Sequence, residues 1–141
     1  MLCFKRKQMK IQTFIEQQPE AAQEVFATFH DRICKYDTLV EASIGPVMGG
    51  EDALVYHQEG VFKYGLTMKK DHFSFHSMVM YTYPDLREEL KAKTKGIKFQ
   101  KGCLHFKTLA QINSTDFQEF IQASAQQDFS PVIAHYQNKK K

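Results

Sequence analysis

The sequence has few cysteines, and it has no apolar run long enough to cross a membrane. Its three cysteines, Cys3, Cys34 and Cys103, are an odd number, lie far apart and form no Cys-x-x-Cys pair. That spacing argues against a disulfide framework or a cysteine-based zinc site, and it fits a reducing compartment. A transmembrane helix needs about 20 apolar residues in a row, and the N-terminus lacks the apolar segment of a signal peptide. We therefore expect a cytoplasmic protein without a membrane partner.

Motifs for phosphate-binding loops and catalytic serines are also missing. The loop that starts at Gly45 has neither the Gly-x-Gly-x-x-Gly nor the Gly-Lys-Ser/Thr pattern, and the chain contains no Gly-x-Ser-x-Gly sequence. Cys34 falls beside a helical apolar stripe and is expected in the core. Cys103 lies two residues from His105 on one predicted strand, which does not by itself activate a thiol. These features favour a binding or carrier domain over an enzyme with a small-molecule pocket.

Charge of one sign is not in large excess. The 19 lysines and arginines outnumber the 16 acidic residues by three, and the basic excess lies in residues 5–7 and 139–141. A nucleic-acid binder usually carries its basic residues as a patch on a folded face, so we expect no nucleic-acid partner. A chain of 141 residues is most simply one domain. We expect a flexible basic arm over 1–8, a single domain over 9–136 and a lysine-rich tail over 137–141.

The segment from Gly60 to His76 gives the clearest structural signal. Apolar residues alternate with other residues in both halves, as in strands with one buried face, and Lys70-Asp71 can form a tight turn between them. This turn pairs Gly65 with His76, and a slip by one residue would separate the apolar sets of the two strands. The residues expected on the core face of this hairpin are Phe62, Tyr64, Leu66, Met68, Phe73 and Phe75.

Helices and further strands are predicted on both sides of this hairpin. A short amphipathic helix over 9–17 is followed by a longer one that begins near Pro19 and runs to about Tyr36, with its apolar stripe packed on the hairpin. The remaining predicted elements are strands over 38–44 and 53–57, a small hairpin over 97–106, and helices that begin at 84 (with Gly96 as C-cap), near 115 and at 130. Because no helix stands between most successive strands, the order predicts an α+β fold with an antiparallel sheet.

The chain from about Ile11 to Gln126 resembles the YdhG-like family, small bacterial domains of mostly unknown function. The resemblance rests on the helices interrupted at Pro19, on Ile44-Gly45-Pro46, and most specifically on Lys70-Asp71-His72-Phe73-Ser74-Phe75-His76. It implies a curved antiparallel sheet packed on one face by N- and C-terminal helices. Some members are described as frataxin-like iron chaperones, so the resemblance implies iron supply for iron–sulfur cluster assembly as an alternative function. Family members commonly have an aromatic residue where this chain has Met48.

The second face of the hairpin, with the loop after Gly45, is the candidate ligand-binding site. Its small and polar residues would leave a shallow open patch, although an ordinary solvated sheet face has the same composition. The candidate residues are Gly65, Thr67, Ser74, His76, Pro46 and Met48. An unknown small molecule or protein is the expected partner, and a homodimer stays open.

The sequence offers few metal ligands. His72 and His76 are four residues apart on a predicted strand, which is about 13 Å at roughly 3.3 Å per residue. They cannot share one zinc ion with bonds of about 2 Å, although one of them could join His57 or His105. Iron favours carboxylate ligands, and the carboxylates along the second helix are Glu20, Glu24 and Asp31. We expect no cofactor, with weak iron binding at these carboxylates as the alternative.

Overall fold

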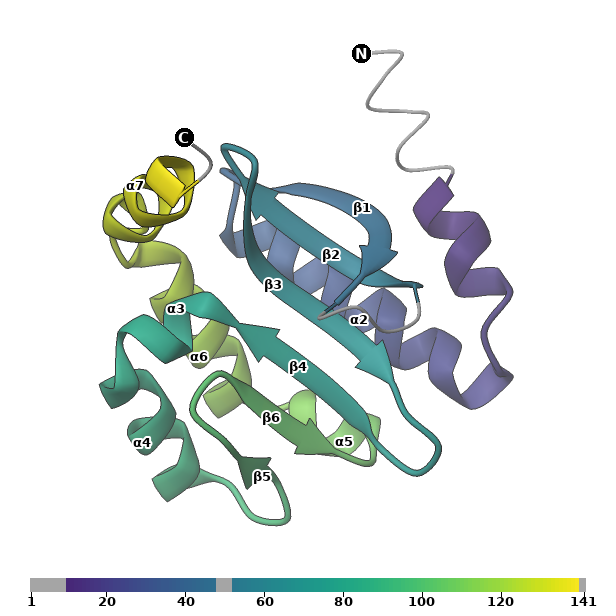
Figure 1. The fold of residues 1–141 in the computed structure, drawn as a ribbon. Coiled ribbons are helices and arrows are strands. Elements are labelled where there is room, and N and C mark those ends of the chain that lie inside the picture. The colour runs from purple at the N-terminus through teal and green to yellow at the C-terminus, as the bar shows by residue number, and fades with distance from the viewer. Residues whose placement is uncertain (1–9, 48–51, 140–141) are drawn as a thin grey trace.

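Six strands form one antiparallel sheet in the order β1-β2-β3-β4-β6-β5 (Figure 1). The strands are β1 (Glu41–Pro46), β2 (Asp52–Gln58), β3 (Val61–Met68), β4 (Phe73–Ser77), β5 (Lys98–Phe99) and β6 (Cys103–Phe106). The computed structural model describes residues 10–47 and 52–139. The expected arm over 1–8, the candidate residue Met48 and the last two residues of the expected tail lie outside the described residues. The predicted α+β class with an antiparallel sheet is confirmed.

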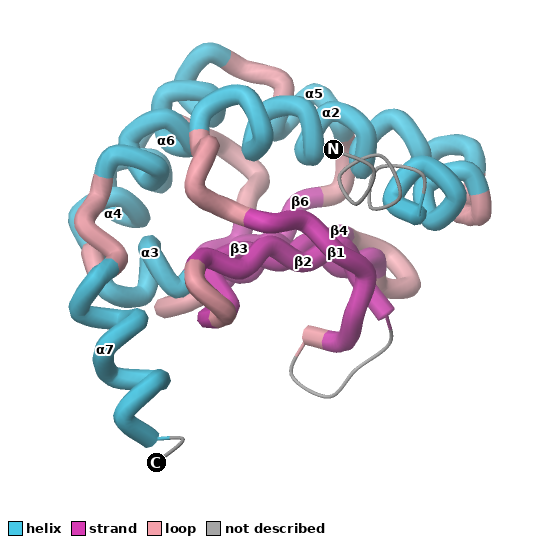
Figure 2. Tube along the Cα trace, turned by 90° about the horizontal axis from the view of Figure 1, so that it is seen from above, coloured by secondary structure: helices cyan, strands magenta, loops and turns pink. Residues whose placement is uncertain are grey.

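Helices cover one face of this sheet and also lie at one of its ends (Figure 2). They are α2 (Glu20–Tyr36), α3 (Met78–Thr82), α4 (Pro84–Lys93), α5 (Leu109–Ile112), α6 (Thr115–Gln126) and α7 (Ser130–Lys139), and residues 10–16 are also helical. Seen from above, α2, α5 and α6 cover one face of the sheet, and the opposite face has no described helix over it (Figure 2). Helix α7 contacts β3 and continues past the expected domain boundary at residue 136 to Lys139. None of the described helices is long and apolar enough to cross a membrane.

The register of the central hairpin agrees with the sequence pattern. Gly65 pairs with His76 and Leu66 with Phe75, and the Lys69 backbone N–H donates to the carbonyl of His72 over 2.7 Å beside the turn. The apolar residues of both strands thus share one face, because strand side chains alternate with a period of two. The predicted pairing is confirmed.

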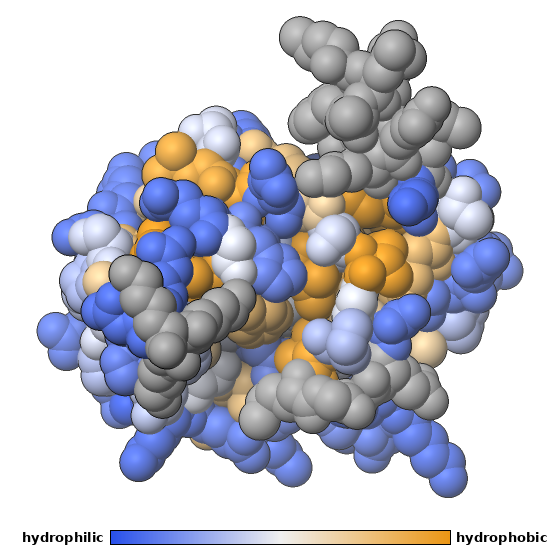
Figure 3. Space-filling view, turned by 45° about the horizontal axis from the view of Figure 1, so that its top comes forward, coloured by the Kyte–Doolittle hydropathy of each residue, from blue (hydrophilic) through white to orange (hydrophobic). Residues whose placement is uncertain are grey.

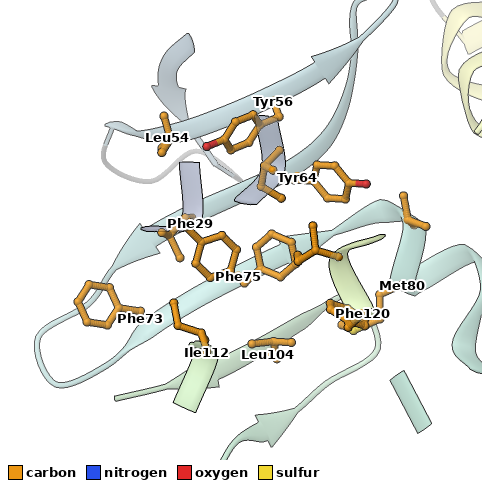
Figure 4. Packing of buried hydrophobic residues seen from close by; sticks show 14 of the residues in the cluster. Phe29, Leu54, Tyr56, Tyr64, Phe73, Phe75, Met80, Leu104, Ile112 and Phe120 are labelled. Carbon is orange, nitrogen blue, oxygen red and sulfur yellow. The ribbon is translucent and has the colours of Figure 1, made fainter. Parts of the chain in front are cut away.

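The core forms where the apolar stripe of α2 meets this hairpin face. Phe29 lies against Phe75 with ring centroids 4.7 Å apart, and Phe26 meets Phe73 edge-on at 6.1 Å. Figure 4 shows Phe29 and Phe75 side by side near the middle of the buried cluster. Phe117 from α6 closes the other side of the Phe29 ring. The expected packing of the second helix on the hairpin is confirmed.

Two residues expected in the core lie elsewhere, partly because β3 contains a β-bulge. Tyr56 of β2 pairs with Tyr64, but the next residue, His57, pairs with Phe62, which leaves Lys63 as the extra residue of β3. The bulge turns Phe62 to the face of the sheet that has no described helix over it, which we call the helix-free face. It also puts Lys63 in the interior, where this residue is 1% exposed. Met68, at the end of β3, is 36% exposed. The core positions predicted for Phe62 and Met68 are therefore wrong.

Element boundaries differ from the sequence pattern at two glycines. Strand β1 begins at Glu41 and continues through Gly45 and Pro46, which were expected to break it, because both pair with β2. Helix α4 ends at Lys93 rather than at a Gly96 cap. Gly96 instead provides a backbone turn with φ of +77° ahead of β5, a conformation that glycine adopts at little cost.

Candidate functional site

The helix-free face of the sheet brings together most of the predicted ligand-binding residues. Thr67 of β3 pairs with Ser74 of β4, and Ser74 pairs in turn with His105 of β6. Two residues further along these strands, and so on the same face, Gly65 pairs with His76, and His76 pairs with Cys103. Residues of three strands therefore form two adjacent rows on this face, of which the sequence pattern predicted the β3 and β4 members.

The half of this face near β1 and β2 is filled rather than open. Phe62 packs there with Val47, Val55 and Ala53 in a small apolar cluster. A Cβ at Gly65 would lie 2.9 Å from Phe62 Cζ and 2.9 Å from Val47 Cγ2, closer than side chains approach one another. The open patch expected around Gly65 is thus occupied, and the missing side chain makes room for this cluster. The candidate residue Pro46 lies at the end of β1, paired with Asp52.

The other half of the face holds the polar groups. Ser74 Oγ and His105 Nδ1 are 2.6 Å apart, and the direction of this hydrogen bond depends on the imidazole tautomer. Ser74 is only 1% exposed, so its hydroxyl cannot reach a substrate. The bond holds the His105 ring in place on the sheet. Ser74 is therefore a positioning residue in this arrangement.

A second histidine reaches the same place from the hairpin turn. The rings of His72 and His105 meet edge-on with centroids 5.0 Å apart. His72 Nδ1 is 2.7 Å from Asp71 Oδ1, and this hydrogen bond, with the charges of His72 and Lys107, holds the pKa of Asp71 below its usual value. The carboxylate of Asp71 is thus engaged by His72.

Positive charge converges on these histidines. Burial lowers the pKa of His105, and the charges of His72, Lys98 and Lys69 lower it further. Burial likewise lowers the pKa of His76, with contributions from Lys69 and His105. Each neighbouring cation disfavours a further positive charge, so the imidazoles of His105 and His76 are protonated less readily than a free imidazole. A bound anion would have the opposite effect.

A cavity of about 300 Å³ opens beside His105. It is lined by Asp71, His72, Gly96, Lys98, His105, Phe106 and Lys107. Strand β5 brings Lys98 directly opposite His105 in the sheet, and Lys107 follows at the end of β6. The cavity therefore has two lysines and two histidines against a single carboxylate. We call it the His105 cavity.

Cys103, although beside this cavity, is a weak nucleophile. Its thiol donates to Gln100 Oε1 over 3.0 Å, and its sulfur lies 3.8 Å from His105 Nε2. Burial raises the pKa of the Cys103 thiol, which keeps it protonated at neutral pH. The site is therefore suited to binding by charge and hydrogen bonds rather than to attack by sulfur.

The predicted iron ligands do not form a comparable site. Glu20, Glu24 and Asp31 lie exposed along α2. Within residues 10–47 and 52–139, no group of three histidine, cysteine or acidic side chains is placed to hold a metal ion.

Two larger cavities lack the histidines of the His105 cavity. One of about 570 Å³ lies between the helical residues 10–16 and the edge strand β1, and its charged lining residues are Lys10 and Asp52. Figure 3 shows apolar surface in orange on this side of the molecule. A cavity of about 390 Å³ includes the candidate residue Thr67 beside Met68 and Lys69. The first cavity has a mainly apolar lining. The second has Lys69, Lys70 and Asp52 in its lining but no histidine.

The sequence pattern missed two groups of charged residues. One is the cation set of the His105 cavity, which could have been found by pairing Lys98 with His105 across the predicted small hairpin. The other is a buried ion pair, in which Lys63 Nζ lies 2.7 Å from Asp37 Oδ2. Lys63 also donates to Gln58 Oε1, and the Tyr64 hydroxyl donates to Asp37 Oδ2. No local signal marks this pair, because only the bulge places Lys63 inside.

Comparison of the chain with family models, with curated proteins and with solved structures found no match. Membership of the YdhG-like family therefore stays a prediction that rests on the residues quoted above.

Proposed function

We propose that this protein is a binding domain for a small dianion, such as a phosphate-bearing metabolite, which it holds in the His105 cavity. One observation carries the proposal. Lys98, Lys107, His72 and His105 line a single cavity whose one carboxylate, Asp71, is already hydrogen-bonded to His72.

This arrangement disfavours a positive charge on His105. Lys98 lies directly opposite His105 across β5 and β6, so a protonated His105 would place like charges opposite each other, which destabilises a sheet. A bound anion would offset the repulsion and accept charge-assisted hydrogen bonds from the lysines. Each such bond contributes about 1.5–3 kcal/mol. Two of them at about 2 kcal/mol each correspond to a dissociation constant on the order of 1 mM.

The size of the cavity limits the ligand. Sites for drug-sized molecules range from about 300 to about 1,000 Å³, and the His105 cavity lies at the lower limit, with about 300 Å³. Its size thus suits a phosphate or sulfate group on a small organic body.

This proposal keeps the sequence-based hypothesis of a non-enzymatic binding or carrier domain and moves its site along the sheet, from Gly65 toward Ser74 and His105. Iron supply stays a prediction of the family resemblance, and no observation within the described residues favours it over anion binding.

The proposal is tested by titrating inorganic phosphate at constant ionic strength and following backbone amide resonances. The double variant Lys98→Gln/Lys107→Gln should bind at least about tenfold more weakly, because each lost ammonium removes a charge-assisted bond. The matched control Lys10→Gln/Lys91→Gln removes two exposed charges away from the cavity. It should bind within about twofold of the original chain, since surface charges at a distance are screened. Equal losses in both double variants, or no binding by the original chain at about 20 mM phosphate, would contradict the proposal.

A further inference from the structure

We infer that binding in the His105 cavity is coupled to proton uptake by His105, so that the anion and one proton are taken up together. This inference rests on the proposed function. It follows from the place of the His105 ring, which lies between Ser74 on β4 and the lysines that line the cavity.

Five of the seven ionisable groups around His105 are cationic or become cationic on protonation. The groups that face it are His72 and Asp71 from the hairpin turn, Lys69 after β3, His76 from β4, Lys98 from β5, Cys103 on its own strand and Lys107 after that strand. The single carboxylate among them, Asp71, has His72 as its partner. His105 therefore lacks a carboxylate counter-ion of its own in this set.

An anion in the cavity would supply that missing counter-charge. Without a ligand, burial and the neighbouring cations lower the pKa of His105 and keep its ring neutral. A dianion against the ring favours the protonated form, because an opposite charge nearby raises the pKa of a histidine. Linkage is reciprocal, so protonation of His105 must strengthen anion binding by the same factor by which the anion favours the proton.

The bond to Ser74 allows this change without a movement of the ring. A serine hydroxyl can both donate and accept a hydrogen bond. Ser74 donates to Nδ1 when that nitrogen is bare, and it accepts from Nδ1–H when the ring is charged, over the same 2.6 Å. His105 can thus gain its charge in place, with Nε2–H as a second donor.

Sulfate is the appropriate probe, because it keeps a charge of −2 across the pH range in which histidine titrates. We expect sulfate to bind the original chain about tenfold more tightly at pH 5.5 than at pH 7.5, with the two dissociation constants measured by calorimetry. Calorimetry near pH 7 in two buffers of different ionisation enthalpy should show net proton uptake. The ring resonances of His105 should titrate at higher pH when sulfate is present.

Two variants test whether the pH dependence of sulfate binding comes from His105. His105→Gln should bind weakly at both pH values, with less than about twofold difference between them. His135→Gln, a control on α7, should keep the pH dependence of the original chain. No sulfate binding by the original chain at either pH overturns the proposed function. Binding that is equally tight at both pH values, or a pH dependence that persists in His105→Gln, overturns the coupling and leaves the proposed function standing.

Discussion

Two groups of charged residues lie in this sheet, and they have opposite surroundings. Lys63 and Asp37 form a dry ion pair in which each side chain is 1% exposed and hydrogen-bonded to further partners. Lys98 and His105 face each other beside a cavity at the sheet edge, with no carboxylate of their own among its lining residues. The first group is complete without a ligand, whereas the second would be stabilised by the anion that the proposed function supplies. This difference assigns stability to the first group and binding to the second.

The largest expected effect comes from breaking the buried pair. Lys63→Met leaves the Asp37 carboxylate buried without its cation, which should lower the free energy of unfolding by about 3–5 kcal/mol. Urea denaturation measures this loss, with Lys91→Met on exposed α4 as a control expected to stay within about 0.5 kcal/mol. The double variant Lys63→Met/Asp37→Leu should recover most of the stability, because an apolar pair can replace a buried ion pair. If the double variant is no more stable than Lys63→Met, the buried pair does not act as a self-contained unit.

A smaller loss is expected in the filled half of the helix-free face. Gly65→Ala places a Cβ 2.9 Å from both Phe62 and Val47, and such overpacking costs about 1–3 kcal/mol. Gly45→Ala is the matched control on the same face, since its Cβ would meet Val55 at an ordinary 3.8 Å. Thermal unfolding of the two variants compares them directly. Equal stability of Gly65→Ala and Gly45→Ala would show that this half of the face is open.

Acidification should destabilise the protein through its histidines. The pKa values of His30, His76 and His105 lie below the ordinary 6.5, chiefly because of burial. The unfolded chain then binds more protons below pH 6.5, so stability that is present above this pH is lost as the pH falls toward the folded pKa values. Each unit by which folding lowers a histidine pKa reduces the free energy of unfolding by about 1.4 kcal/mol once the pH is below both the folded and the unfolded pKa.

Melting temperatures between pH 8 and pH 5 measure this loss. His30→Gln should flatten the profile and His135→Gln should not, because His30 is buried on α2 and hydrogen-bonded to the Tyr56 hydroxyl. Sulfate should reduce the fall in melting temperature of the original chain on acidification. The fall in melting temperature of Lys98→Gln/Lys107→Gln should be nearly the same with and without sulfate. A melting temperature that rises as the pH falls below 6.5 would contradict the assigned pKa directions.

The smallest effect is expected at Ser74. Ser74→Ala removes one hydrogen bond to a half-buried ring, which should cost about 0.5–1 kcal/mol. The control Ser124→Ala removes a hydroxyl that bonds within α6 to the Phe120 carbonyl, far along the chain from the histidines. Only Ser74→Ala should alter the titration of the His105 ring, as followed by its proton resonances. An unchanged titration would show that Ser74 does not position His105.

Local patterns were sufficient for the central hairpin. Alternation and a two-residue turn defined the pairing of Gly65 with His76. Helical spacing predicted that the apolar stripe of α2 packs on the hairpin, where the structure places Phe29 against Phe75. The bulge at Lys63 was not visible, because Phe62 and Tyr64 alternate as they would in a regular strand. Only the pairing with β2 shows that one residue is extra.

The candidate site was predicted in part. Ser74 and His76 were placed on the correct face, because that follows from the hairpin alone. Their neighbours on β6 and β5 depend on which strand pairs with β4, and Ser74 and His105 are 31 residues apart in the chain. The filling of the space over Gly65 likewise depends on Val47 in a distant loop. Long-range pairing, rather than residue type, determines the chemistry of this face.

The length of β5 has a consequence for the timing of binding. This edge strand has only two residues, and it presents Lys98 to the cavity, whereas the other wall lies inside the sheet on β6. Short edge elements with few ladder hydrogen bonds open locally far more often than central strands. Amide hydrogens of Lys98 and Phe99 should therefore exchange with solvent well before those of Leu104 and Phe106. Local opening of this strand would then remove one wall of the cavity while the rest of the sheet stays folded.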